Sequence, residues 1–307
     1  MSNFRETALQ NGIHAVIVPA THLNDLRTDI ENFVATQELN GHQKFIIEHY
    51  EYEPQEPKFE VKSVIVTATP HPSFGDAVFE QAGKTRTVYY TAGTGGNEPR
   101  DYVTKVVTDA GFSLELSGVM LPRKRFAVQA GLCEYGRDNI AYLPGYGSYI
   151  AIDAYYTDMP SDEDSWRDVV TADACTKCHT CEAVCPTGAI RPDRFLIDST
   201  LCLCLINEGK EPFPETLPKN AHHAIVGCLR CQYVCPMNEQ ANKNTFPTVH
   251  FTETETARLM QGAPYEDLVE SLKARYFALE MNFAGDLPRN LQVCFDIIDG
   301  GGKCSLV

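Results

Sequence analysis

Apolar residues in the first 70 positions recur with the spacings of both strands and helices. Residues 13–19 form a short apolar run that proline ends, and we expect a strand there. Residues 58–69 hold a second strand, apolar enough to lie inside a sheet that is covered on both faces. Between them, residues 22–38 carry apolar side chains at helical spacing, with Thr21 as the expected cap.

A third strand is expected at residues 86–92, followed by a glycine turn at 93–96 and a helix near 98–110. A glycine turn before a helix can bind phosphate through backbone N–H groups. Here the glycines do not follow the G-x-G-x-x-G order, so an ordinary turn is the favoured interpretation.

A short helix is predicted at residues 123–131, and its first turn is basic, with Arg123, Lys124 and Arg125. The helix dipole disfavours positive charge at this end. Two interpretations stay open: an anionic ligand or partner near these residues, or a solvated cluster of charges.

Two apolar runs, 139–143 and 148–156, are separated by a hairpin-type loop at 144–147. Residues 158–168 are polar and acidic, and we take them as the boundary before the next domain.

The second half of the chain has fewer regular patterns. Residues 209–226 predict a polar loop that contains proline, and residues 246–254 an irregular segment. The strongest amphipathic helix is predicted at 265–281. A last helix starts at Pro288 and ends at Gly300–Gly302, and we expect a mobile tail after it.

The 307 residues are 43% hydrophobic and carry a net charge of −15. That charge disfavours nucleic acid and suits docking to basic partners. No apolar run reaches a membrane-spanning length, and the N-terminus shows no export signal, so we expect a cytoplasmic protein without a membrane segment. The last four residues, from Cys304, loosely fit a prenylation box, although a simple tail is the favoured interpretation.

The first of two cysteine motifs has the pattern C-x2-C-x2-C-x3-C-P, with Cys175, Cys178, Cys181 and Cys185 followed by Pro186. This is the ligand run of bacterial two-cluster ferredoxins. Three cysteines two residues apart wrap a tight loop, so their thiolates converge on one iron–sulfur cube. The fourth cysteine starts a new turn and points to another cube.

The second motif is incomplete. Cys228, Cys231 and Cys235 stand before Pro236, but Ile225 occupies the position where a further cysteine would complete the run. Two cubes need eight thiolates, and the two motifs supply seven. We expect the eighth to be Cys202 or Cys204, which lie between the motifs.

The spacing therefore predicts two [4Fe–4S] clusters with crossed ligand sets. The first set is Cys175, Cys178, Cys181 and Cys235; the second is Cys185, Cys228, Cys231 and one of Cys202 or Cys204. Structural zinc sites also use C-x2-C pairs, but they do not explain four cysteines in so short a run, repeated in part. Disulfides are not expected in a chain without a secretory signal.

Residues 126–239 resemble epoxyqueuosine reductases and, more distantly, the core of reductive dehalogenases. The landmarks are an ordered set of short motifs: Ala130-Gly131-Leu132 with Gly136 and Asn139, Tyr146-Gly147-Ser148, Thr157-Asp158-Met159-Pro160, the first cysteine motif with Pro186–Ile190, Asp198 with Cys202, and Gly227–Pro236. The family pattern favours Cys202 over Cys204 as the eighth ligand, because Cys202 follows the aspartate at the family's spacing.

The resemblance implies an α/β (α+β) fold in three parts. A nitroreductase-like domain that binds a cofactor would span 1–160, a ferredoxin-like domain with two [4Fe–4S] clusters 161–245, and a helical C-terminal extension 246–307. In such proteins the first domain holds cobalamin, and electrons reach it through the clusters. A cobalamin-dependent reductase, or a descendant of one, is therefore implied.

Four residues near the implied cofactor face are candidate cofactor contacts: Ser117, Cys133, Arg137 and Tyr146. Ser117 stands where the family has a proton-donating aspartate, and serine is a poor general acid near neutral pH. Cys133 and Arg137 replace the family's glycine and lysine. Cys133 is either a substitute ligand or donor, or a buried inert thiol. The family's C-terminal module for tRNA is absent or much shortened in this sequence, so we do not carry over epoxide reduction on tRNA.

Three functions are compatible with these observations. The first is a reductase that passes electrons through two clusters to a cofactor, supplied by a low-potential donor such as ferredoxin or flavodoxin. The second is an electron-transfer module that reduces the corrinoid of a partner protein without substrate chemistry of its own. The third is a binding protein whose clusters only stabilise the fold.

Overall fold

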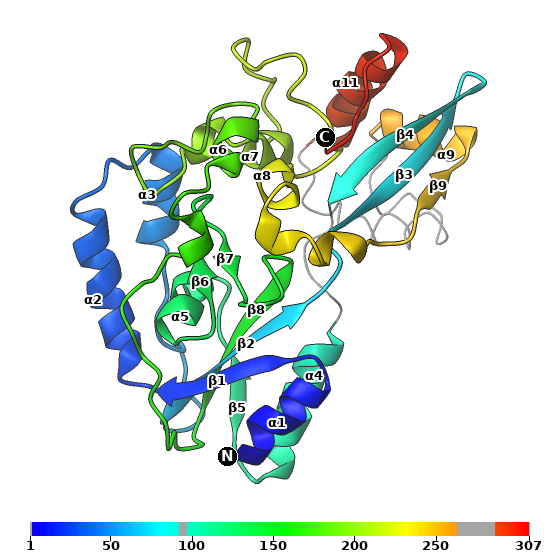
Figure 1. The fold of residues 1–307 in the computed structure, drawn as a ribbon. Helices are drawn as coiled ribbons and strands as arrows, with labels where there is room; N and C mark the ends of the chain where they lie inside the picture. Colours follow the sequence, from blue (N-terminus) through cyan, green and yellow to red (C-terminus); the bar gives the residue numbers. More distant parts are fainter. Residues whose placement is uncertain (1, 92–96, 263–285, 307) are drawn as a thin grey trace. The chain divides into compact units, whose positions relative to one another are not determined.

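The fold is that of a computed structural model, which describes residues 2–91, 97–262 and 286–306. The chain divides into two compact units (Figure 1): unit 1 comprises residues 1–71 and 94–178, and unit 2 comprises residues 72–93 and 179–307. The predicted glycine turn at 93–96 and helix at 265–281 lie outside the described residues. The domain boundaries expected at 160 and 245 stay predictions.

Unit 1 is built on a four-stranded antiparallel sheet in the order β1-β2-β8-β5 (Figure 1), with strands β1 (His14–Pro19), β2 (Ser63–Pro70), β8 (Ile150–Thr157) and β5 (Leu114–Leu116). The central strand β2 is buried from Ser63 to Ala68, because its run of small and β-branched residues packs on both faces. The first two predicted strands are confirmed.

Among the described residues of unit 1, the α-helices are α1 (Ser2–Gln10), α2 (His22–Val34), α3 (Gly41–Glu48), α4 (Glu98–Asp109) and α5 (Arg123–Gln129). The predicted helices at 22–38, 98–110 and 123–131 are confirmed with shorter bounds. The expected cap is wrong: Thr21 has helical backbone angles and its side chain makes no cap hydrogen bond. The side-chain cap is found at α3, where Asn40 and Gln43 form a capping box.

The two apolar runs around residues 144–147 do not pair as neighbouring strands of one hairpin. Strand β7 (Ala141–Tyr142) pairs with β6 (Glu134–Tyr135), whereas β8 pairs with β2 and β5. Across the loop only the bridge between Leu143 and Gly147 is formed. The turn is therefore present, but it joins two sheets.

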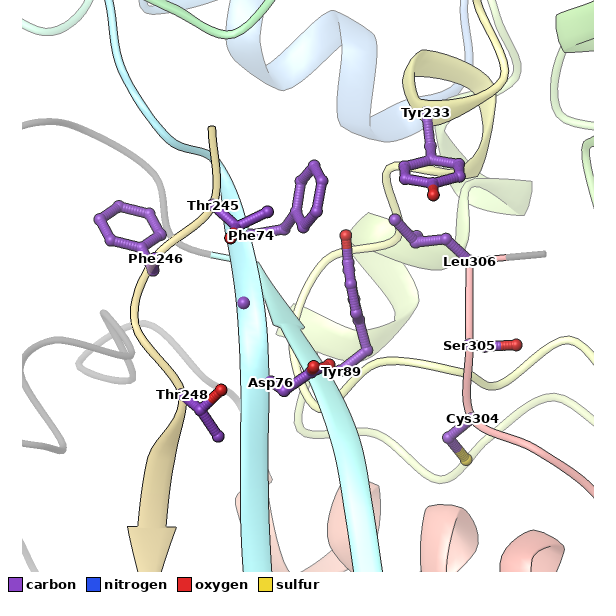
Figure 2. Close-up of a pocket in the computed structure, with 11 residues that line it drawn as sticks. Phe74, Asp76, Tyr89, Tyr233, Thr245, Phe246, Thr248, Cys304, Ser305 and Leu306 are labelled. Carbon is purple, nitrogen blue, oxygen red and sulfur yellow. The ribbon is translucent and has the colours of Figure 1, made fainter. Parts of the chain in front are cut away.

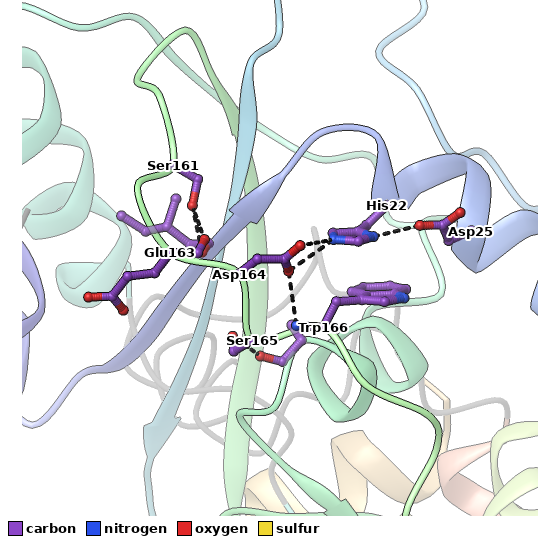
Figure 3. Close-up of polar contacts among 9 residues, drawn as sticks. His22, Asp25, Ser161, Glu163, Asp164, Ser165 and Trp166 are labelled. Carbon is purple, nitrogen blue, oxygen red and sulfur yellow. Dashed lines mark hydrogen bonds and ion pairs between the residues drawn. The ribbon is translucent and has the colours of Figure 1, made fainter.

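The acidic segment at 158–168 packs within unit 1 (Figure 3). Asp164 accepts from His22 Nε2 at 2.9 Å, and the other ring nitrogen of His22 lies 2.6 Å from Asp25. The Trp166 ring stacks on the His22 ring with centroids 4.4 Å apart, and Ser165 Oγ donates to the carbonyl of Ala130. These contacts fix the chain that leads into the first cysteine motif.

Unit 2 contains a three-stranded sheet in the order β4-β3-β9, formed by β3 (Phe74–Gln81), β4 (Lys84–Thr91) and β9 (Val249–Phe251). The predicted third strand is β4. The prediction of an irregular segment at 246–254 is wrong. Strand β9 pairs parallel with β3, and the Phe251 ring stacks on the Phe79 ring with centroids 4.7 Å apart.

The α-helices in the described part of unit 2 are α6 (Thr180–Val184), α7 (Leu203–Glu208), α8 (Arg230–Tyr233), α9 (Glu253–Met260) and α11 (Leu287–Asp299). Helix α11 confirms the predicted last helix. The expectation of a mobile tail is wrong, since Cys304 and Leu306 are buried. Among the helices of the described residues, none is long and apolar enough to cross a membrane.

The prediction of a polar loop at 209–226 is wrong for residues 221–226. Residues 221–226 are buried, and Ile225 donates its N–H to Tyr89 on β4. Asn290 on α11 donates to the carbonyls of Ile225 and Asn207, which holds this segment between the sheet and α11. An apolar Ile225 replaces a cysteine here because the position belongs to the core.

The buried His222 makes the stability of this segment dependent on pH. Burial, with the nearby Arg289 charge, lowers the pKa of His222 from 6.5 to about 4, and its Nδ1 has no hydrogen-bond partner among the described residues. The unfolded chain therefore binds a proton more readily, and stability is lost as pH falls from about 6.5 towards 4. We expect His222→Gln to remove on the order of 2 kcal/mol of the loss in unfolding free energy between pH 7 and pH 4. Chemical denaturation of both proteins at several pH values measures this loss. The same pH dependence of the unfolding free energy in both proteins would contradict the role of His222.

Candidate metal centre

The start of the first cysteine motif is held by Arg137, which follows β6. The Arg137 guanidinium donates to the carbonyl oxygens of Cys175 (2.7 Å) and Cys178 (2.9 Å). Burial raises the pKa of the Cys175 thiol, and the backbone N–H of Arg137 opposes that rise by donating to the sulfur. One residue thus shapes the loop and stabilises a thiolate in it.

The two motifs have the same local structure around their last cysteines. Helix α6 carries Cys181 and ends immediately before Cys185, and α8 carries Cys231 and ends two residues before Cys235. These two short helices pack against each other within unit 2. Cys175 and Cys178 belong to unit 1, and the other six predicted ligands belong to unit 2.

Three cysteines of the predicted second set, Cys185, Cys202 and Cys228, interact through their charges in unit 2, although no three His, Cys, Asp or Glu side chains of the described residues are placed to hold a single metal ion. Burial raises the pKa of Cys228 to about 12, and the charges of Cys202 and Cys185 add to that rise. The Cys228 sulfur accepts the backbone N–H of Arg230, and the Cys202 sulfur accepts those of Cys204 and Leu205. Thiols that accept backbone N–H groups are the type of donor that an iron–sulfur cluster uses.

The loop before Cys228 is fixed by glycine and histidine. Gly227 has φ +69°, and a Cβ there would lie 2.3 Å from Thr91 Oγ1. The ring nitrogens of His223 lie 2.7 Å from the carbonyl oxygen of Cys228 and 2.8 Å from that of Ala221. The backbone around Cys228 therefore has little freedom before any metal binds.

Cys204, the competing candidate for the eighth ligand, is held in a different way. Its thiol donates to Glu208 Oε1 at 3.1 Å along α7. Burial and the negative charge of Glu208 raise its pKa well above the usual value. A cluster ligand must be a thiolate, so this environment favours Cys202 over Cys204.

The four candidate cofactor contacts lie in unit 1, and each is engaged by neighbouring protein groups. Ser117 is buried, and its hydroxyl accepts from Arg123 Nε at 3.1 Å. Cys133 is fully buried, which raises its pKa to about 12. Arg137 binds the first cysteine motif. Tyr146 is half-exposed and makes an edge contact with His14.

The basic first turn of α5 is neither solvated nor open to an anion. Arg123 also pairs with Asp153, Arg125 pairs with Asp29, and Lys124 donates to the carbonyl of Asn139. Burial lowers the pKa of Lys124 to about 8. These ion pairs and this hydrogen bond attach α5 to neighbouring parts of unit 1.

A comparison with protein families decides the chemistry of the cysteine motifs. Residues 174–238 match the family described as a 4Fe-4S double cluster binding domain. The match supports two [4Fe–4S] clusters in this part of the chain. The match begins just before Cys175 and ends just after Cys235, so it covers both motifs of the double cluster domain.

Curated relatives of the chain are epoxyqueuosine reductases. The protein from Francisella cf. novicida is 34% identical over 151 residues, which are 48% of this chain and 37% of the relative. The protein from Listeria monocytogenes is 29% identical over 138 residues, which are 45% of this chain and 33% of the relative. The resemblance is confirmed, although the chain spans only a third to a half of the length of such relatives.

Solved structures agree on the fold. Epoxyqueuosine reductase from Bacillus subtilis is 18% identical, with a TM-score of 0.63 over 96% of this chain and 80% of that chain. A second reductase, crystallised with a modified tRNA stem loop, is 20% identical with a TM-score of 0.64 over the same shares. The α/β fold with an N-terminal domain before the double cluster domain is therefore confirmed.

Sequence reasoning missed the residues that support the cysteines. Arg137 was expected at a cofactor, and its role at the first motif depends on a contact 38 residues away. His223 and Glu208 act through a backbone carbonyl and a thiol, which no spacing rule reveals. The adjacent histidines in a segment predicted to be a polar loop were the only available signal.

Replacing Arg137 with lysine is expected to loosen the first motif, because lysine keeps the charge but loses the planar fork that reaches two carbonyls. We expect several-fold faster loss of iron to a chelator from the Arg137→Lys protein. Arg191→Lys is the matched control, since Arg191 pairs with the exposed Asp193 in the same family domain. Equal rates of iron loss in the two variants would contradict the role assigned to Arg137.

Proposed function

We propose that this chain is an iron–sulfur reductase whose clusters are held by eight cysteines. The first set is Cys175, Cys178, Cys181 and Cys235, and the second is Cys185, Cys202, Cys228 and Cys231. The observation that carries the proposal is that backbone N–H groups are directed at the sulfurs of Cys202 and Cys228, two thiols whose charges act on each other and on that of Cys185.

The donor set fits the group that the family match requires. Bound clusters supply one-electron transfer at potentials that depend on hydrogen bonds to sulfur and on burial. The chain provides both. Backbone N–H groups of Arg137, Cys204, Leu205 and Arg230 stabilise thiolates, and Arg137 places a positive charge beside the first motif.

We propose a corrinoid in the N-terminal domain as the destination of the electrons. The support is the named reductase relatives and the fold that the chain shares with them. Tyr146 offers an exposed ring, whereas Ser117 and Cys133 are buried, so contacts from these two would need a local rearrangement. Anaerobic protein loaded with iron and sulfide should retain cobalamin through gel filtration. Intact clusters without corrinoid uptake would count against this destination.

A second candidate is an electron-transfer module that reduces the corrinoid of a partner. It is favoured by Ser117, a residue that is 4% exposed and whose hydroxyl accepts from Arg123, so no carboxylic acid stands at that position. Stopped-flow mixing of the reduced protein with a corrinoid protein tests it. Rapid transfer to the partner, with no corrinoid in this chain, would favour the module over the reductase.

The partners follow from the same chemistry. We propose a low-potential donor such as ferredoxin or flavodoxin and a cytoplasmic location, where cysteines stay reduced. The net charge of −15 argues against nucleic acid, whereas the relative solved with a tRNA stem loop argues for it. A binding measurement with an anticodon stem loop at near-physiological salt decides whether the chain binds nucleic acid. At that salt concentration a weak, purely electrostatic contact is lost.

A further inference from the structure

The C-terminal tail borders a cavity in unit 2 that no part of the proposed electron path uses. The cavity has a volume of about 260 Å³ and lies between β3 and the tail at residues 304–306 (Figure 2). The rings of Phe74, Tyr89 and Tyr233 form part of its wall. Its size and its mixed lining suit a small organic molecule.

Two thiols outside the eight predicted ligands meet at this cavity. Cys304 lines it and is 9% exposed, whereas Cys294 on α11 is fully buried behind it. The Cys304 thiol lies 3.5 Å from the carbonyl oxygen of Cys294, and the two thiols are hydrogen-bond partners. A thiol that lines a cavity and is backed by a second thiol is the arrangement that thiol–disulfide exchange needs.

The electrostatic environment gives the two thiols different reactivity. The hydrogen bond with Cys294 lowers the pKa of Cys304 despite burial, and the positive charge of Arg230 lowers it further. The same hydrogen bond, with burial, raises the pKa of Cys294 well above the usual value. Cys304 also lines the cavity, whereas Cys294 does not, so Cys304 is the attacking thiol and Cys294 is the thiol that completes the exchange.

The charge at the cavity selects the kind of molecule that enters. Asp76 on β3 lies at the wall, is exposed, and has no ion-pair partner in the described part of the chain. Its charge adds to burial in raising the pKa of Tyr90 to about 12. A carboxylate beside aromatic faces favours a ligand that carries an amine.

We propose that Cys304 and Cys294 are a redox-active dithiol that reduces a small, amine-bearing disulfide bound in this cavity. The Cys304 thiolate attacks one ligand sulfur, the ligand S–S bond breaks, and one ligand thiol leaves after taking up a proton. Cys294 then loses its proton and attacks Cys304, which releases the second ligand thiol. The ligand disulfide gains two electrons, and the dithiol becomes the Cys294–Cys304 disulfide.

The join between α11 and the tail allows this bond to form. Gly300–Gly302 connect the two cysteines, and Gly301 has φ +86°, which a residue with a side chain rarely adopts. A disulfide needs the sulfurs to approach to about 2 Å. Only a short segment after this glycine turn has to move.

Cystamine tests the proposal on the full-length, cluster-loaded protein without oxygen. Wild type should release both ligand thiols, and peptide mapping after acid quenching should find Cys294 joined to Cys304. Cys294→Ser should instead keep half of the ligand on Cys304, and Cys304→Ser should not react. Cys133→Ser, which removes a buried thiol of unit 1 and keeps both cysteines of the cavity, should behave as wild type. Equal release by the Cys304→Ser protein, or no link between the two cysteines in wild type, would overturn the proposal.

The Asp76→Asn variant distinguishes recognition of the amine in the cavity from the intrinsic reactivity of the Cys304 thiol. We expect it to slow the reaction with cystamine several-fold and leave that with the neutral 2-hydroxyethyl disulfide unchanged. Equal slowing with both would overturn the selection of an amine. Iron content, measured for each variant, shows that the clusters survive. If a cysteine variant fails to fold, limited alkylation of wild type replaces it: Cys304 should be modified before Cys294 and Cys133, and any other order overturns the assignment.

Discussion

The Cys231→Ala protein is expected to hold about half of the iron of the wild type, about four atoms instead of about eight per chain. Cys231 is on α8 in unit 2 and belongs to the proposed second set. Cys178→Ala should remove the other half, because Cys178 belongs to the first set. Metal binding and folding of the loop are coupled, so the loop with the missing ligand should also lose order.

Iron and acid-labile sulfide, measured together with the visible spectrum, check this expectation. The matched control is Cys133→Ala, which removes a fully buried thiol outside both sets and should keep all of the iron. Unchanged iron in both ligand variants would refute the assignment. Complete loss of iron from both would instead show that neither cluster assembles without the other.

A second large effect on cluster content is expected from substitutions of Cys202 and Cys204, which lie two positions apart. Cys202→Ala should lose the second cluster, and Cys204→Ala should keep it. The Cys202 sulfur accepts two backbone N–H groups, which stabilise a thiolate, whereas Cys204 lies beside the carboxylate of Glu208, which disfavours one. Both variants change cysteine to alanine at the start of α7, where Cys202 is the N-cap and Cys204 lies in the first turn, so their difference reports the ligand.

Electron paramagnetic resonance of the dithionite-reduced variants gives the result without reference to stability. The Cys204→Ala protein should show the interacting signals of two reduced clusters, and the Cys202→Ala protein the signal of one. The reverse pattern would make Cys204 the eighth ligand. Glu208→Gln, which removes the charge beside Cys204, would then be expected to strengthen cluster binding.

Local patterns in the sequence predicted the elements of unit 1 well. The strand at residues 13–19 and the apolar strand up to residue 69 could be predicted because each is a run of mainly apolar residues that are consecutive in the sequence. The segment at 221–226 was missed because its burial depends on Asn290 and on β4, more than 60 and 130 positions away along the chain. Strand β9 was missed for the same reason, since its three residues form a strand only beside β3.

The cysteine spacing predicted the chemistry but not what supports it. A motif of this kind reports which side chains can share a cluster, because the loop geometry depends on residue number alone. It does not report Arg137, which reaches the first motif from the turn between β6 and β7. Nor does it report that Cys304, expected in a mobile tail, meets Cys294 at a cavity.

The central claim is that eight cysteine thiolates hold two iron cubes in this chain. Metal and sulfide analysis of protein purified without oxygen tests it most directly, with cobalt and zinc measured in the same sample. The account predicts about eight iron and about eight sulfide per chain. Stoichiometric zinc with little iron or sulfide would contradict it.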